Sequence, residues 1–143
     1  MKHYLGVGYF VHPLPLLAVV LLIVNDRFLK AAYPSFVTGK LSDVAGLFFF
    51  PLFLCAVVCL FANLLSGRRK NIYWINRPLL FAMILLTALI FGSVKVWPEA
   101  TNLYLRGMEA LGVPSNVTHD PSDLWALLIL PVTYIFGVRF IES

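Results

Sequence analysis

The stretch DVAGLFFFPLFLCAVVCLFANLL, Asp43 to Leu65, decides the fold class. After its first residue it contains no charged side chain. A helix needs about 20 mainly apolar residues to cross the hydrocarbon core of a bilayer, and this stretch provides them. Three more stretches are similarly apolar: Tyr4–Val24, Pro78–Trp97 and Asp123–Ile141. The sequence therefore predicts an all-α integral membrane protein with four transmembrane helices.

Composition supports this class. Hydrophobic residues make up 60% of the 143 residues and charged residues only 13%, whereas a soluble domain has about 25% charged residues. A water-soluble chain of this length cannot bury so much apolar surface, so we expect the lipid bilayer to be its main partner. The net charge of +4 is spread without a long basic run or a nucleic-acid-binding module. We therefore expect no nucleic-acid partner.

Lysine and arginine placement predicts the orientation. The link 67–77 between the second and third stretches is short and carries Arg68, Arg69, Lys70 and Arg77. Such short basic links stay on the cytoplasmic side. We therefore expect this link and both termini in the cytoplasm, and the membrane to be a bacterial inner membrane.

The longest link, between the third and fourth stretches, contains a further helical pattern. Ala100–Leu111 places Tyr104, Met108 and Leu111 on one face, and Gly112 is a typical residue for the end of a helix. A short amphipathic segment of this kind lies along the membrane surface. We predict a short interfacial helix here.

An internal repeat is visible when the chain is shifted by 80 residues. PSFVTGKLSD, residues 34–43, then aligns with PSNVTHDPSD, residues 114–123, and eight of 18 positions are identical up to the proline pair Pro51 and Pro131. The single membrane domain 1–143 is therefore expected to contain two helical hairpins, 1–66 and 78–143, joined by the basic link 67–77. Since each hairpin goes out and returns, the two copies should have the same orientation.

The repeated polar residues have an ordinary structural interpretation. Ser42 and Ser122 would cap the helices that enter the membrane, supported by Thr38 and Thr118 in the preceding turns. The repeated prolines would kink both helices, because proline cannot donate a backbone hydrogen bond.

The same residues also allow two functional interpretations. If Asp43 and Asp123 converge, they form a carboxylate pair of the kind that divides acid and base roles in aspartic hydrolases. Alternatively, Asp43, Asp120, Asp123 and His119 would offer oxygen and nitrogen ligands to a divalent cation.

No Walker loop, dinucleotide fingerprint or HExxH motif occurs in the sequence, and we predict no cofactor beyond a possible divalent cation. The leading hypothesis is a non-enzymatic membrane component: an assembly partner, an effector or a channel-like subunit. A small chain with only short links outside the lipid is expected to work as a homo-oligomer or as a subunit of a membrane assembly. The alternatives are an outward-facing intramembrane hydrolase using Asp43 and Asp123, and a cation-binding membrane protein.

The orientation can be tested with a reporter fused after Ser143. A fluorescent protein that matures in the cytoplasm should be bright there, and alkaline phosphatase at the same position should be inactive, because the basic link 67–77 is retained inside. The opposite pair of signals would reverse the predicted orientation.

Overall fold

All secondary structure in the described part of the chain is helical, which confirms the all-α prediction. The computed structural model describes residues 8, 12–65, 75–112, 117 and 120–142. Its elements, in chain order, are α2 (Pro13–Val24), the π-helical turn η1 (Asn25–Leu29), α3 (Lys30–Ala32), α4 (Phe36–Leu65), α5 (Arg77–Val96), α6 (Pro98–Ala110), the 3-10 helix η2 (Pro121–Ile129) and α7 (Leu130–Glu142).

Three helical segments are long and apolar enough to cross a bilayer. They are Phe36–Leu65, Arg77–Val96 and Pro121–Ile141, the last formed by η2 and α7 together. Many of their large apolar side chains are exposed, as expected for helices whose outer faces contact lipid. The chain is therefore compatible with an integral membrane protein.

The first predicted helix is present as α2. Its expected beginning, at Tyr4, lies outside the described residues, and α2 begins at Pro13, where the His12 side chain accepts a hydrogen bond from the Leu14 amide. The α-helix ends at Val24 as predicted, but the helical run continues through η1 into α3. Asn25, the first residue of η1, is buried, and its side chain donates to α4.

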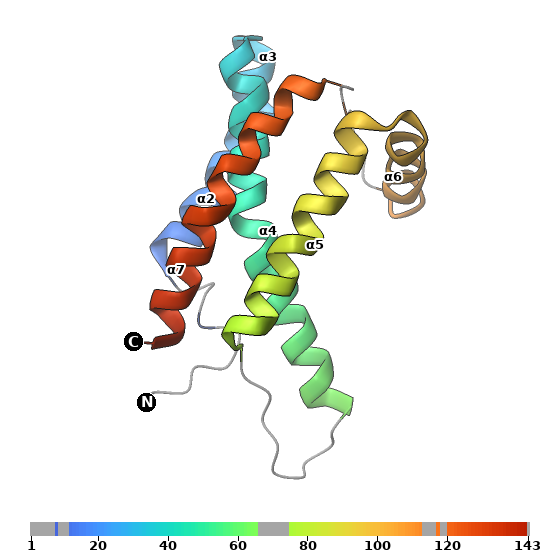
Figure 1. Cartoon of the computed structure of the whole chain (residues 1–143). Helices are drawn as coiled ribbons and strands as arrows, with labels where there is room; N and C mark the ends of the chain where they lie inside the picture. Colours follow the sequence, from blue (N-terminus) through green and yellow to red (C-terminus); the bar gives the residue numbers. More distant parts are fainter. Residues whose placement is uncertain (1–7, 9–11, 66–74, 113–116, 118–119, 143) are drawn as a thin grey trace.

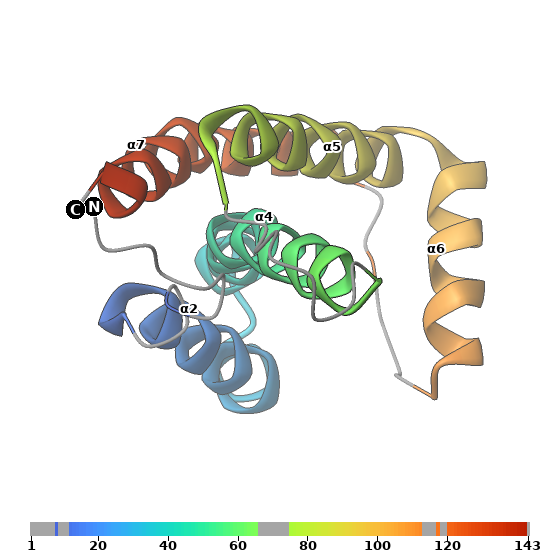
Figure 2. The same cartoon turned by 90° about the horizontal axis from the view of Figure 1, so that it is seen from below.

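The helix α4 is the centre of the arrangement (Figure 2). It lies between α2 on one side and the pair formed by α5 and α7 on the other. The four apolar helices alternate in direction, and the start of α2 lies beside the end of α7, where the His12 ring packs 4.9 Å from that of Phe136 (Figure 1). The core between α4, α5 and α7 consists of small and aliphatic side chains: Leu47, Leu52, Cys55, Cys59, Ile75, Leu80, Ile84, Ala126 and Leu130.

The helix α4 begins seven residues before Asp43, where the sequence placed the membrane entry. The Ser35 hydroxyl accepts a hydrogen bond from the Thr38 amide, and the Thr38 hydroxyl accepts one from the Ser35 amide. This reciprocal capping starts the helix at Phe36. Further along, α4 continues through the buried Pro51 as one helix.

The last membrane segment begins differently from α4. The Asp120 side chain caps η2 by accepting a hydrogen bond from the Ser122 amide, and 3-10 geometry continues to Ile129. Pro131 is the second residue of α7, at the change from 3-10 to α geometry. A residue that cannot donate to the preceding turn fits this junction.

The predicted helix in the longest link is present as α6. It runs across the direction of the bundle at the end of α5 (Figures 1 and 2). The buried Thr101 hydroxyl donates to the Val94 carbonyl oxygen at 2.5 Å and so fastens α6 to α5. The helix stops before Gly112, whose φ of +70° is a conformation that favours glycine.

The helices α5 and α7 pack tightly against each other at Gly137. A Cβ atom at this position would lie 2.6 Å from the Leu80 Cδ2 atom, and Leu80 is fully buried. The absence of a side chain at Gly137 therefore sets the spacing of these two helices.

Gly137→Ala should destabilise the protein by about 1–3 kcal/mol relative to Gly46→Ala, because the new methyl group overpacks against Leu80. Gly46 is the matched control: it is also helical, and a Cβ there meets nothing within 4 Å. Thermal unfolding in detergent measures both. Adding Leu80→Val should recover part of the loss; equal melting temperatures for the two alanine variants would contradict the close approach.

Candidate functional site

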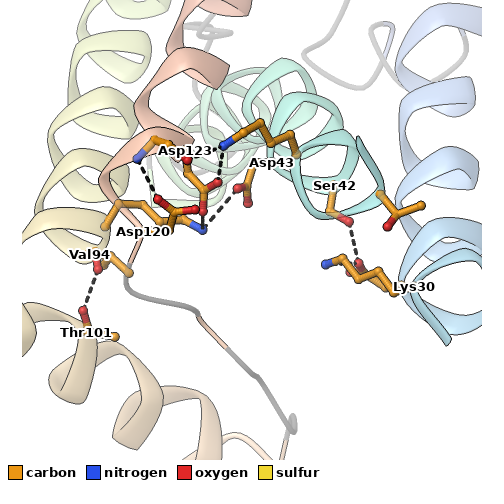
Figure 3. A network of polar contacts seen from close by, with 12 residues as sticks. Lys30, Ser42, Asp43, Val94, Thr101, Asp120 and Asp123 are labelled. Carbon is orange, nitrogen blue, oxygen red and sulfur yellow. Dashed lines mark hydrogen bonds and ion pairs between the residues drawn. The ribbon is translucent and has the colours of Figure 1, made fainter. Parts of the chain in front are cut away.

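Four charged side chains meet at one end of the bundle (Figure 3). Lys40 and Asp43 lie near the start of α4, Lys95 lies in the last turn of α5, and Asp123 lies in the first turn of η2. We call these four residues the ionic cluster. It forms because three separate membrane segments either begin or end at this level.

Lys95 is at the centre of the ionic cluster. Its Nζ atom lies 2.6 Å from the Asp123 Oδ2 atom and 3.1 Å from the Asp43 Oδ2 atom. Only 7% of Lys95 is exposed. One buried ammonium group therefore binds carboxylates from two different helices.

Lys40 binds the second oxygen of Asp123. Its Nζ atom lies 2.7 Å from the Asp123 Oδ1 atom and 2.9 Å from the Ser122 Oγ atom. The same ammonium group lies 4.3 Å from the centroid of the Phe36 ring, within range for a cation–π interaction. Both oxygens of Asp123 are therefore occupied by lysines.

The formal charges in the ionic cluster balance, with two lysines and two aspartates. Burying an unpaired charge is very unfavourable, and within membrane segments charged residues survive chiefly by pairing with one another. Removing one member leaves its partner without compensation. The cluster is therefore both a strong link between α4, α5 and η2 and a point of vulnerability.

A second polar group lies on the other side of α4. The Asn25 Nδ2 atom donates to the Thr38 carbonyl oxygen at 2.6 Å and to the Ser42 Oγ atom at 2.5 Å. The Ser42 hydroxyl donates to Asp26 at 2.5 Å, and Asp26 pairs with Lys30 at 2.8 Å. We call these five residues the η1–α4 network. It joins the end of the α2 helix to α4.

The residues expected to cap helices have other neighbours. Ser42 lies within α4 and belongs to the η1–α4 network, while Ser122 follows the actual cap, Asp120, and accepts from Lys40. Thr38 lies in the first turn of α4, where its hydroxyl also donates to the Tyr33 carbonyl oxygen. Thr118 is outside the described residues.

The residues expected to bind a divalent cation are only partly together. Asp43 and Asp123 converge, but on an ammonium group, and His119 is outside the described residues. The Asp120 carboxylate interacts with its near neighbour Ser122. Hydrogen bonds from the Ser122 hydroxyl, and to a smaller extent from the Ser122 backbone amide, hold the pKa of the Asp120 carboxyl below the usual range. Within the described ranges, no three His, Cys, Asp or Glu side chains are grouped as metal ligands.

The sequence did not predict that Lys40 binds Asp123 or that Lys95 lies at the centre of the ionic cluster. For Lys95 an indication was present, since a lysine inside an apolar stretch needs a partner of opposite charge. Lys40 gave a weaker one: it occupies the repeat position where the second copy has Asp120.

Comparison with known proteins adds no family. No protein-family model, curated protein or solved structure matches this chain.

Lys95→Met should destabilise the protein by about 3–5 kcal/mol, because two carboxylates lose their shared cation. Lys30→Met is the control, since Lys30 and Asp26 form a pair with side chains 42% and 47% exposed, which contributes about 1 kcal/mol or less. Unfolding in detergent with a chemical denaturant measures both.

The double variant Lys95→Met/Asp43→Asn tests the charge argument itself. It leaves Lys40 and Asp123 as one balanced pair, so it should be more stable than Lys95→Met alone. A double variant that is less stable than the single one would show that packing, and not charge, explains the loss.

Proposed function

We propose that this protein is a non-enzymatic component of a membrane assembly, in which the ionic cluster fixes three membrane segments relative to one another. The observation that carries this proposal is the Lys95 ammonium group, buried between Asp43 and Asp123. The balanced charges of the ionic cluster, and its position between helices, favour a structural role over a reactive site.

A hydrolase that uses Asp43 and Asp123 is the second candidate. It is favoured by the convergence of these two carboxylates from separate helices. An acid–base pair, however, needs the two carboxyl groups to share a proton and to reach a substrate. Here the Lys95 ammonium group contacts both carboxylates, where a shared proton or a substrate would have to bind, and this weakens the candidate.

A cation-binding function has less support. The oxygens that would bind a divalent cation are those that accept from Lys40 and Lys95. A cation would have to displace a lysine and leave that ammonium group unpaired in a membrane segment, which is unfavourable.

The proposed membrane arrangement has four crossing helices. The continuous helical run from Pro13 to Ala32, through η1, supplies the fourth beside the three segments described above. The helix α6 would lie in the interface, with the exposed side chains of Leu103 and of its C-cap Leu111 toward lipid. The ionic cluster would face outward, with both termini in the cytoplasm of a bacterial cell and the helices in its inner membrane.

The repeat hypothesis fits this arrangement. The hairpins α2–α4 and α5–α7 would be the two copies, and Asp43 and Asp123, aligned in sequence, bind the same ammonium group. The two copies differ in geometry where they begin, because α4 starts at Phe36 as an α-helix and η2 starts at Pro121 as a 3-10 helix.

The exposed apolar face of α2 supports assembly with other subunits or with further copies of this chain. This helix packs on α4, and its outer residues Leu16, Leu17 and Val20 are at least half exposed. With few residues outside the membrane segments, the chain has little other surface for a partner.

The experiment compares Asp43→Asn with wild type in lipid nanodiscs, using particle mass from light scattering and hydrolysis of membrane peptides, phospholipids and isoprenoid diphosphates. We expect a mass above that of one chain and no turnover by either protein. Asp43→Asn should lower the melting temperature, since an amide pairs less strongly with Lys95.

Turnover by the wild type that Asp43→Asn abolishes, at an unchanged melting temperature, would replace this proposal by the hydrolase. A melting temperature that rises with calcium or magnesium in the wild type but not in Asp43→Asn would support the cation-binding alternative.

A further inference from the structure

One buried polar atom of the η1–α4 network has no hydrogen-bond partner within the described part of the chain: the Oδ1 atom of Asn25. Asn25 is 0% exposed and begins the π-helical turn η1. Buried polar groups are nearly always paired, so an unpaired acceptor of this kind indicates a ligand. Insertions of π geometry are also frequent at functional positions in helices.

The side-chain donors near Asn25 are already in use. Its own Nδ2 atom donates to Thr38 and Ser42, and the Ser42 hydroxyl donates to Asp26. The Thr38 hydroxyl donates backward, to the Tyr33 and Ser35 carbonyl oxygens. The Oδ1 atom therefore needs a donor from outside this network.

The orientation of the Asn25 amide follows from the same contacts. Exchanging its nitrogen and oxygen would place Oδ1 2.6 Å from the Thr38 carbonyl oxygen, which also only accepts. The exchange would replace the hydrogen bond to Thr38 by a contact between two acceptors. Oδ1 could then be paired only if the Ser42 hydroxyl donated to it and no longer to Asp26. Oδ1 is thus the atom that faces away from α4's polar groups.

Charge decides what kind of ligand fits. The one carboxylate of the network, Asp26, is already paired with Lys30 at 2.8 Å. A bound cation would add an uncompensated positive charge, whereas a neutral donor would not. The ligand must also be very small, because the Oδ1 atom is enclosed.

We propose that Asn25 Oδ1 binds one buried water molecule, held at the junction of α2, η1 and α4. This water completes the hydrogen bonding of Asn25, which connects the end of α2 to Thr38 and Ser42, and it is therefore part of the folded structure. The inference is independent of the proposed function, since it involves neither the ionic cluster nor a partner.

The test is an experimental structure of the full chain at a resolution that shows ordered water, for the wild type and for Asn25→Leu. We expect a density peak about 2.7–3.2 Å from Asn25 Oδ1, the hydrogen-bond range. The peak should be absent in Asn25→Leu, which keeps the side-chain size but has no acceptor. An empty site, an Oδ1 bonded to a protein donor, or a peak that persists in Asn25→Leu would each overturn the proposal.

Thermal unfolding in sodium, potassium and choline chloride at equal ionic strength separates water from a monovalent cation. We expect the same melting temperature in all three salts for both proteins. A melting temperature raised by sodium or potassium in the wild type alone would identify a cation at Asn25 and reject water.

Discussion

The ammonium group of Lys95 is the constraint on which the end of the bundle with the ionic cluster depends. It lies within hydrogen-bond distance of two carboxylates, on α4 and on η2, and it is itself on α5. In lipid, apolar contacts between helices gain little over contacts with hydrocarbon chains, so polar links and close packing determine which helices meet. Here Lys95 links α5 to η2 at one end of the bundle. Further along, Gly137 of α7, the helix that continues η2, packs closely on Leu80 of α5.

The start of α4 joins the two sides of the molecule. Ser42 and Asp43 are neighbours in sequence, but Ser42 bonds to η1 and Asp43 to α5 (Figure 3). Successive residues on a helix point about 100° apart, so one turn of a central helix serves two partners. Because the Ser35–Thr38 capping starts α4 at Phe36, this turn lies within the helix and not at its first residues.

The helical class, α5 and α6 could be predicted from the sequence to within a few residues, since apolar length and cap residues are local properties. The continuation of the first helix through η1 and α3 could not, because Asn25 and Asp26 look like the end of a helix until their partners on α4 are known. For the candidate site, the repeat pointed to Asp43 and Asp123 but not to Lys40. Which cation reaches which carboxylate depends on how helices from different parts of the chain pack, and that information is not in the spacing of residues.

The order of the cluster along the chain has a consequence for synthesis. Asp43 leaves the ribosome before Lys95, and Asp123 follows both. Until α5 is complete, the first carboxylate has no lysine from another segment, and until η2 arrives the Lys95 ammonium group has only one of its two acids. Helices with such residues enter lipid less readily alone than together. The early segments should therefore remain beside the insertion machinery until the last one arrives, so that the chain is released into the bilayer as a single unit.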